Sequence, residues 1–202
     1  MKAEAIGIAL LIVIPATFSI LIFTPAGSIL SPPPQTGYIG TSWAQWYANL
    51  SSMTKSVDVI AVGQVVGVNR TITGGLPFTD FDVKLLNVIK PVGFQAPFLT
   101  VRQTGINQSG KVFQVEDDPL FKINQTYVFF LFHARTSGRV VVPGLYYVAA
   151  GPEGRFVVNS KGLVYSLDIV YPSQVTETIP TRVDGQPLTS FVAEIESGLV
   201  GS

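Results

Sequence analysis

The stretch Val57–Val68, V-D-V-I-A-V-G-Q-V-V-G-V, decides the fold that we expect for this chain. It is dominated by valine, and β-branched residues favour the extended backbone of a strand. Gly63 and Gly67 fall on the Val65 side of that strand, where small residues indicate strong curvature or the close approach of another element. We therefore expect this stretch to be the first strand of a small, strongly coiled β-barrel.

Further strand-like runs follow at short intervals, which predicts a mainly β domain. They are Thr79–Lys90, Phe98–Gln103, Lys111–Val115, Thr126–His133, Arg139–Ala150, Gly154–Val158 and Leu163–Leu167. The run Thr126–His133, T-Y-V-F-F-L-F-H, is apolar on both faces and should form the central buried strand. In the run Thr79–Lys90, Asp80 and Asp82 alternate with apolar residues, which places both carboxylates on the wet side of the sheet.

A helical pattern flanks the strands on each side. The first covers Ser42–Lys55, with Ser42 and Gln45 placed as a capping box. Its apolar stripe consists of Trp43, Trp46, Tyr47, Leu50 and Met53. We interpret this helix as a cover for one open end of the barrel; alternatively, the stripe grips a membrane interface or a partner.

The second helical pattern lies near the C-terminus, with Thr189 or Ser190 as its cap. Its apolar face consists of Leu188, Phe191, Val192, Ile195 and Leu199. The expected architecture is thus a mainly β barrel with flanking N- and C-terminal helices.

The N-terminus carries a membrane signal. Residues 5–23 contain no charged side chain, and their length approaches the ~20 residues that a helix needs to cross a bilayer. We expect residues 1–26 to be an uncleaved signal anchor, that is, a transmembrane helix; a cleaved signal peptide and a buried core helix are the alternatives. Residues 27–41 are rich in proline, glycine and serine and predict a linker. The external domain then spans residues 42–202.

The composition limits the partners and the chemistry. Charged residues make up 13% of the chain and the formal net charge is zero, which argues against nucleic acid because phosphate neutralisation needs a basic face. The chain has no cysteine, which excludes disulfides, thiolate zinc sites and thiol nucleophiles. The external domain must therefore be held together by its core, which its length allows.

Four short motifs carry a resemblance to a known group of domains. They are D-V-I-A-V-G-Q-V at 58–65, V-I-K-P at 88–91, F-K-I-N-Q-T-Y-V-F-F-L at 121–131 and A-A-G-P-E-G-R-F-V-V at 149–158. Over residues 42–167 the chain resembles a diffuse group of secreted or anchored bacterial and archaeal domains, which look like small OB-type, netrin-like barrels with flanking helices. Asn124 stands where that group usually has a turn glycine, and the disulfides that netrin-like domains often carry are absent. The resemblance implies a fold but no activity.

The chain offers little material for catalysis. His133 is the only histidine, and its place at the end of the most apolar run predicts a rim histidine or a satisfied core histidine. A single histidine without cysteine cannot form the usual zinc site, and no G-x-S-x-G turn presents a serine. Glu116, Asp117 and Asp118 form the only acidic cluster; we expect a solvated loop there, with Ca²⁺ binding as the alternative. We expect no enzyme, no cofactor and no metal.

Four asparagines begin an N-x-S/T acceptor sequence and are glycosylation candidates: Asn49, Asn69, Asn107 and Asn124. Asn69, Asn107 and Asn124 fall in expected loops, where a glycan is solvated. Asn49 falls on the expected first helix.

Together these features predict a non-enzymatic, membrane-anchored extracellular domain, or a secreted one if the N-terminal segment is cleaved. It would contact the membrane through its N-terminal helix and bind a protein, a glycan or another cell-envelope component on a strand face or rim of the barrel. The alternative is a structural subunit of a surface filament that donates residues 28–40 as a strand to the next copy. An enzyme with an unfamiliar site around His133 is the third hypothesis.

Overall fold

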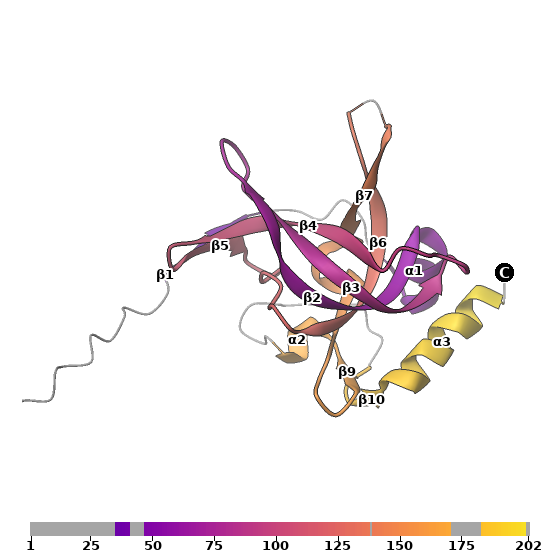
Figure 1. The fold of residues 1–202 in the computed structure, drawn as a ribbon. Helices are drawn as coiled ribbons and strands as arrows, with labels where there is room; N and C mark the ends of the chain where they lie inside the picture. The colour runs from indigo at the N-terminus through magenta and orange to yellow at the C-terminus, as the bar shows by residue number, and fades with distance from the viewer. Residues whose placement is uncertain (1–34, 41–46, 138, 171–182, 201–202) are drawn as a thin grey trace, which may run out of the picture. The chain divides into compact units, whose positions relative to one another are not determined.

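Strands dominate the structure, a computed structural model that describes residues 35–40, 47–137, 139–170 and 183–200. The strands are β1 (Gln35–Ile39), β2 (Val59–Ile72), β3 (Phe78–Lys90), β4 (Phe98–Gln108), β5 (Lys111–Val115), β6 (Thr126–Arg135), β7 (Val141–Val148), β8 (Arg155–Val158), β9 (Leu163–Tyr165) and β10 (Gln186–Pro187). The helices are α1 (Leu50–Ser56), α2 (Leu167–Val170) and α3 (Leu188–Val200), with a 3₁₀ turn, η1, at Gly151–Gly154 (Figure 1). All described residues belong to one compact unit, Pro33–Ser202.

Five strands close into a barrel in the order β2-β3-β4-β7-β6, with β6 returning to β2. β4 and β7 run parallel, and the other neighbouring pairs are antiparallel. All five strands send side chains into the interior, as a small barrel requires. These interior residues include Val65, Phe81, Val101, Phe129 and Tyr146. The predicted mainly β fold with a small barrel is confirmed.

β2 and β6 are buried on both faces. Val59 and Phe129 belong to the core inside the barrel, whereas their neighbours Ile60 and Phe130 belong to a second core outside it. Two buried faces explain why both strands are nearly continuous apolar runs rather than alternating ones. The prediction that Thr126–His133 forms a central buried strand is confirmed.

Helices α1 and α3 pack on each other and on the outer face of β2 and β6. Met53 of α1 and Phe191 and Ile195 of α3 are buried in this outer core, which confirms the predicted apolar face of the C-terminal helix. The expectation that the N-terminal helix covers an open end of the barrel is wrong. It lies against the outer face of the sheet, because strands that are apolar on both sides need a second cover.

The described helices begin at other residues than predicted, and the predicted capping box of Ser42 and Gln45 lies outside the described residues. α1 begins at Leu50, and the Oδ1 atom of Asn49 caps it by accepting the Ser52 amide at 2.9 Å. α3 begins at Leu188, before both predicted cap residues.

Two predicted N-terminal features fall outside the described residues: the apolar segment 5–23, and residues 42–46, which include both tryptophans. Among the helices that the structure describes, none is long and apolar enough to cross a membrane.

Two strands extend beyond the barrel into stretches where loops are expected. β2 continues to Ile72 along β3, and β4 continues to Gln108 along β5. The paired neighbour satisfies the backbone groups along one edge of each extension, so these polar stretches remain extended. β1, from the expected linker, then adds to β5 in parallel. On the opposite side, β8, β9 and β10 extend the sheet from β6.

Gly63 lies at a point of close approach between β2 and β3. A Cβ atom added there would lie 2.5 Å from Cγ1 of Val83 and 3.3 Å from the carbonyl oxygen of Lys84. The register between the two strands also shifts at several places, and such bulges coil a strand. The predicted close approach and curvature are confirmed at Gly63. At Gly67 an added Cβ would meet nothing within 4 Å.

We expect Gly63→Ala to lower the free energy of unfolding by about 1–3 kcal/mol, because the added methyl group overpacks the stiff, buried Val83. Gly67→Ala, on the same strand, is the matched control and should leave stability within about 0.5 kcal/mol. Urea unfolding followed by circular dichroism measures both. Equal losses for the two variants would contradict this account of the β2–β3 contact.

Candidate functional site

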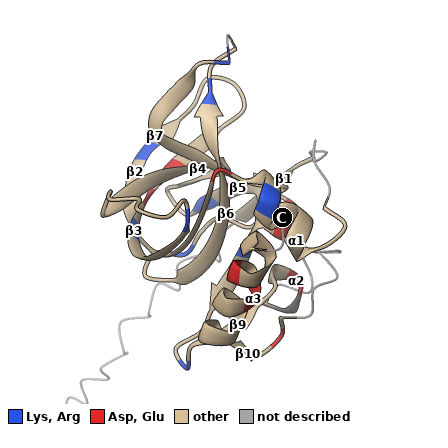
Figure 2. Ribbon diagram, turned by 90° about the vertical axis from the view of Figure 1, so that its right-hand side faces the viewer, with Lys and Arg blue, Asp and Glu red and all other residues tan. Residues whose placement is uncertain are grey.

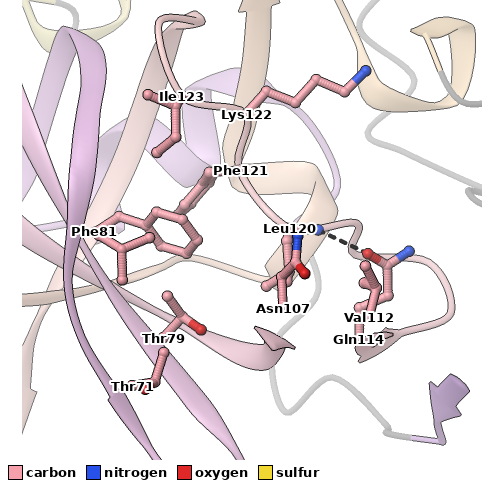
Figure 3. A pocket seen from close by; sticks show the side chains of 11 residues that line it. Thr71, Thr79, Phe81, Asn107, Val112, Gln114, Leu120, Phe121, Lys122 and Ile123 are labelled. Carbon is pink, nitrogen blue, oxygen red and sulfur yellow. Dashed lines mark hydrogen bonds between the residues drawn. The ribbon is translucent and has the colours of Figure 1, made fainter. Parts of the chain in front are cut away.

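A pocket of about 290 Å³ lies at one end of the barrel, between the extended strands and the segment that joins β5 to β6. Figure 3 shows the side chains that converge on it. The pocket is lined by Val68, Thr71, Thr79, Phe81, Asn107, Val112, Gln114, Leu120, Phe121, Lys122 and Ile123. An apolar floor with hydroxyl and amide groups around it is the usual composition of a binding site for a small ligand or a side chain.

We call residues 116–125, which join β5 to β6, the plug. Phe121 of the plug enters the barrel interior and makes edge-to-face contacts with Phe81, Tyr127 and Phe129, with ring centroids 5.1 to 5.5 Å apart. Because Phe121 also lines the pocket, the plug forms one wall of the pocket and closes the aromatic core behind it.

Two glutamine side chains hold the plug backbone. The Phe121 amide donates to Oε1 of Gln103 at 2.9 Å, and Nε2 of Gln103 donates to the carbonyl oxygen of Pro119 at 2.9 Å. The Leu120 amide donates to Oε1 of Gln114 at 3.1 Å. Buried backbone groups need such partners, so the chain can leave the sheet here without losing hydrogen bonds.

A buried cation also holds the plug. Arg155 of β8 is 1% exposed, and its Nη2 atom lies 2.7 Å from Oδ1 of Asp118 and also donates to the carbonyl oxygen of Pro119. The guanidinium carbon lies 4.5 Å from the centre of the Phe121 ring, within cation–π range. Nε and Nη1 of Arg155 have no hydrogen-bond partner among the described residues. Since a buried charge without its counter-ion is costly, the Asp118 carboxylate is essential to this arrangement.

The acidic cluster differs from the predicted solvated loop. Glu116 is exposed, but Asp118 is buried against Arg155. Burial raises the pKa of Asp118 above its ordinary value, and the positive charge of Arg155 opposes that rise. The described part of the chain contains no group of three or more histidine, aspartate or glutamate side chains placed to hold a metal ion.

Asp80 is also wrongly predicted, because it does not lie on a wet face. Its side chain is 1% exposed and accepts hydrogen bonds from Arg102 Nε at 2.6 Å and from Arg70 Nε at 2.9 Å. Burial alone would raise the pKa of Asp80, but the hydrogen bonds from Arg102 and Arg70 hold that pKa below its ordinary value. This cluster joins β2, β3 and β4 next to the pocket residue Thr79.

His133 does not line the pocket. Its Nδ1 atom lies 3.1 Å from Oδ2 of Asp58, which also accepts the His133 backbone amide at 2.9 Å. Burial would raise the pKa of Asp58, but the hydrogen bonds from His133 outweigh it and lower that pKa. The imidazole also lies beside the tilted ring of Tyr146, with ring centroids 4.8 Å apart. These contacts fit a histidine that is satisfied within the fold.

The four glycosylation candidates are all exposed. Asn107 lines the pocket, and Asn124 follows the pocket residue Ile123 with a φ of 66°. Asn69 and Asn107 lie on β2 and β4 rather than in loops, and Asn49 is a helix cap. Their modification stays a prediction.

Sequence reasoning finds Asn107 but misses the rest of the pocket. The lining comes from four strands and the plug, which meet only after the barrel has closed. The motif at 121–131 marks the stretch but gives no reason to assign it a site. Arg155 carries no sequence signal either, since a lone arginine in an apolar run is not distinctive.

Charged residues of both signs lie on the barrel strands, whereas α2 and α3 carry acidic residues only (Figure 2). No protein-family model and no curated protein matches this chain. The geometry of the pocket and the plug is therefore the basis for the functional argument.

We expect Arg155→Met to cost about 3–5 kcal/mol of unfolding free energy at neutral pH, because it leaves the Asp118 carboxylate buried without a cation. Burial raises the pKa of folded Asp118 and the charge of Arg155 opposes that rise, so the pKa should be higher still in the variant. The unfolded state is the same in both proteins, so the loss should shrink as the pH falls from the folded pKa of Asp118 in the variant to its lower folded pKa in the wild type. Urea unfolding of the wild type and the variant over that pH range measures the difference between their unfolding free energies. Carboxylates that titrate alike in both proteins do not contribute to this difference.

The matched control is the double variant Asp118→Asn/Arg155→Met, which removes both charges and should recover at least about half of the loss. A loss that is independent of pH, or a double variant that is worse than Arg155→Met alone, would show that the ion pair does not hold the plug.

Proposed function

We propose that this chain is a non-enzymatic extracellular domain that binds a protein or cell-envelope component at the pocket between its extended strands and its plug. The observation that carries this proposal is the lining of the pocket. Phe81 and Phe121 give an apolar floor, and Thr71, Asn107 and Gln114 place hydroxyl and amide groups around it. Among the described residues that line the pocket there is no carboxylate or imidazole, which supports binding over acid–base chemistry.

The proposal includes an OB-type, netrin-like barrel. The order β2-β3-β4-β7-β6, with its one parallel pair between β4 and β7, supports that assignment, because OB-type barrels are closed by five strands in this arrangement. The resemblance of the four sequence motifs to OB-type, netrin-like domains is a second support for this assignment.

The proposal also places the domain outside the cell, attached to the membrane by residues 1–26. The uncharged segment 5–23 and the absence of a basic stretch in the chain support an anchor rather than attachment to an anionic surface. The prolines of the linker support a spacer between membrane and domain.

The filament alternative has less support. β1 lies within residues 28–40, and it pairs with β5 of its own chain. A second copy would have to displace that strand in order to donate its own. The geometry therefore favours a binding domain.

One experiment on intact cells tests the location and the site together. Cells carrying the full-length chain are treated with a membrane-impermeant, amine-reactive crosslinker, and the chain is then recovered from washed membranes. We expect an adduct with one envelope component, and we expect Thr71→Trp, which fills the pocket mouth, to reduce it by at least about tenfold. Val92→Trp, at a 97% exposed position just after β3 and away from the pocket, is the matched control and should leave the adduct unchanged.

Recovery of the intact chain from the cytosol would contradict the proposed location. Adducts of equal yield from wild type and Thr71→Trp would contradict the proposed site.

A further inference from the structure

The outer part of β2, residues 66–72, has a strand on one side only. It pairs with β3, whereas the pairing of β2 with β6 ends at Gln64. Two further backbone bonds join Val65 to Asn124 and Gln125 of the plug, at 2.7 and 3.0 Å. Beyond Val65, no described residue forms a backbone hydrogen bond with this edge of β2.

This open edge is exposed and partly apolar. Val66 and Val68 are 39% and 52% exposed, although most residues in the first half of the same strand are buried. A row of unpaired N–H and C=O groups beside exposed valines is a template for pairing with another extended chain. Proteins usually protect such an edge with charged residues, proline, β-bulges or a covering element. Residues 66–72 contain neither lysine nor proline, and their one charged side chain, Arg70, is held by Asp80 at 2.9 Å. The register with β3 shifts at Val66 and at Asn69, which bends this edge without covering it.

The edge also borders the pocket. Val68 and Thr71 belong to residues 66–72 and line the pocket, and Ile123 of the plug, 44% exposed, lines it from the other side (Figure 3). A chain that pairs with this edge therefore places alternate side chains over the pocket mouth, since side chains along a strand alternate between its two faces.

We propose that residues 66–72 of β2 receive an extended peptide segment of a partner protein as an added strand, with one apolar side chain of that segment in the pocket. This inference rests on the proposed function, because it names the class of ligand for the same pocket. Main-chain hydrogen bonds along the edge supply affinity, and the pocket supplies specificity. The floor formed by Phe81 and Phe121 selects an apolar side chain.

An extended peptide fits this site better than a glycan does. A glycan cannot present N–H and C=O groups at the spacing of a strand, whereas a peptide backbone can. The volume of about 290 Å³ also suits one large side chain rather than a chain of sugars.

The test uses a displayed library of random 12-residue peptides selected on the full-length chain in detergent. The selected peptides are then resynthesised with a single backbone N-methyl group at each position in turn. We expect N-methylation at alternate positions to weaken binding by about tenfold or more, because only every second amide faces the edge. Hydrogen exchange of the amides of residues 66–72 should slow on peptide binding.

Side-chain variants give the matched pair. Val68→Lys should weaken binding of the selected peptides by about tenfold or more, while Val92→Lys, an exposed valine at the far end of β3, should not change it. One outcome is that the selected peptides lose affinity for the Val68→Lys variant and yet show no alternation in the effect of N-methylation and no slowed hydrogen exchange at residues 66–72. That result would overturn the added strand and leave the pocket as a ligand site. Failure to select any peptide, or binding that ignores Val68→Lys, would overturn the inference itself.

Two other occupants would also overturn it. Protection of residues 66–72 that rises with protein concentration in the absence of peptide would mean that a second copy covers the edge. A glycan found by mass spectrometry on Asn69 of the native chain would mean that sugar covers it.

Discussion

The arrangement of the site depends on one buried ion pair. Arg155 has almost no solvent contact, so its charge must be balanced within the protein, and Asp118 with the Pro119 carbonyl oxygen supplies that balance. Both partners belong to the plug, so satisfying Arg155 fixes the path of the chain between β5 and β6. The same guanidinium lies on the ring of Phe121, which anchors the plug in the barrel. Without this pair the pocket would lose the wall that the plug provides.

A second constraint is that β2 and β6 serve two cores. Their inner faces fill the barrel, and their outer faces carry α1 and α3. This use of both faces explains how a chain with few charges and no disulfide holds itself together. It also explains why the first half of β2 is buried and the second half is exposed. The strand is buried where it serves both cores and becomes exposed from Val66 onward, where it lies beside the pocket.

Sequence patterns predict most of the strands because periodicity and β-branched runs report local preferences. Lys111–Val115 is predicted with its correct bounds, and Thr126–His133 with its correct burial. The errors arise where tertiary pairing overrides local polarity. The alternation of polar and apolar residues predicts a solvated Asp80. In the structure Asp80 is buried and paired with two arginines on the neighbouring strands. The sequence around Asp118 predicts a solvated loop, but Asp118 is buried in an ion pair with Arg155, which is distant in the sequence. The pocket could not be predicted, because its lining meets only once the barrel has closed.

The central claim is that the plug is a fixed part of the barrel rather than a surface loop. Native-state hydrogen exchange of the full-length chain tests it most directly, at the Phe121 amide bonded to Gln103 and the Lys122 amide bonded to the Tyr127 hydroxyl. The account predicts that both amides exchange as slowly as that of the core residue Phe129, through opening of the whole barrel. Exchange as fast as at the exposed turn Ser109–Gly110 would contradict it.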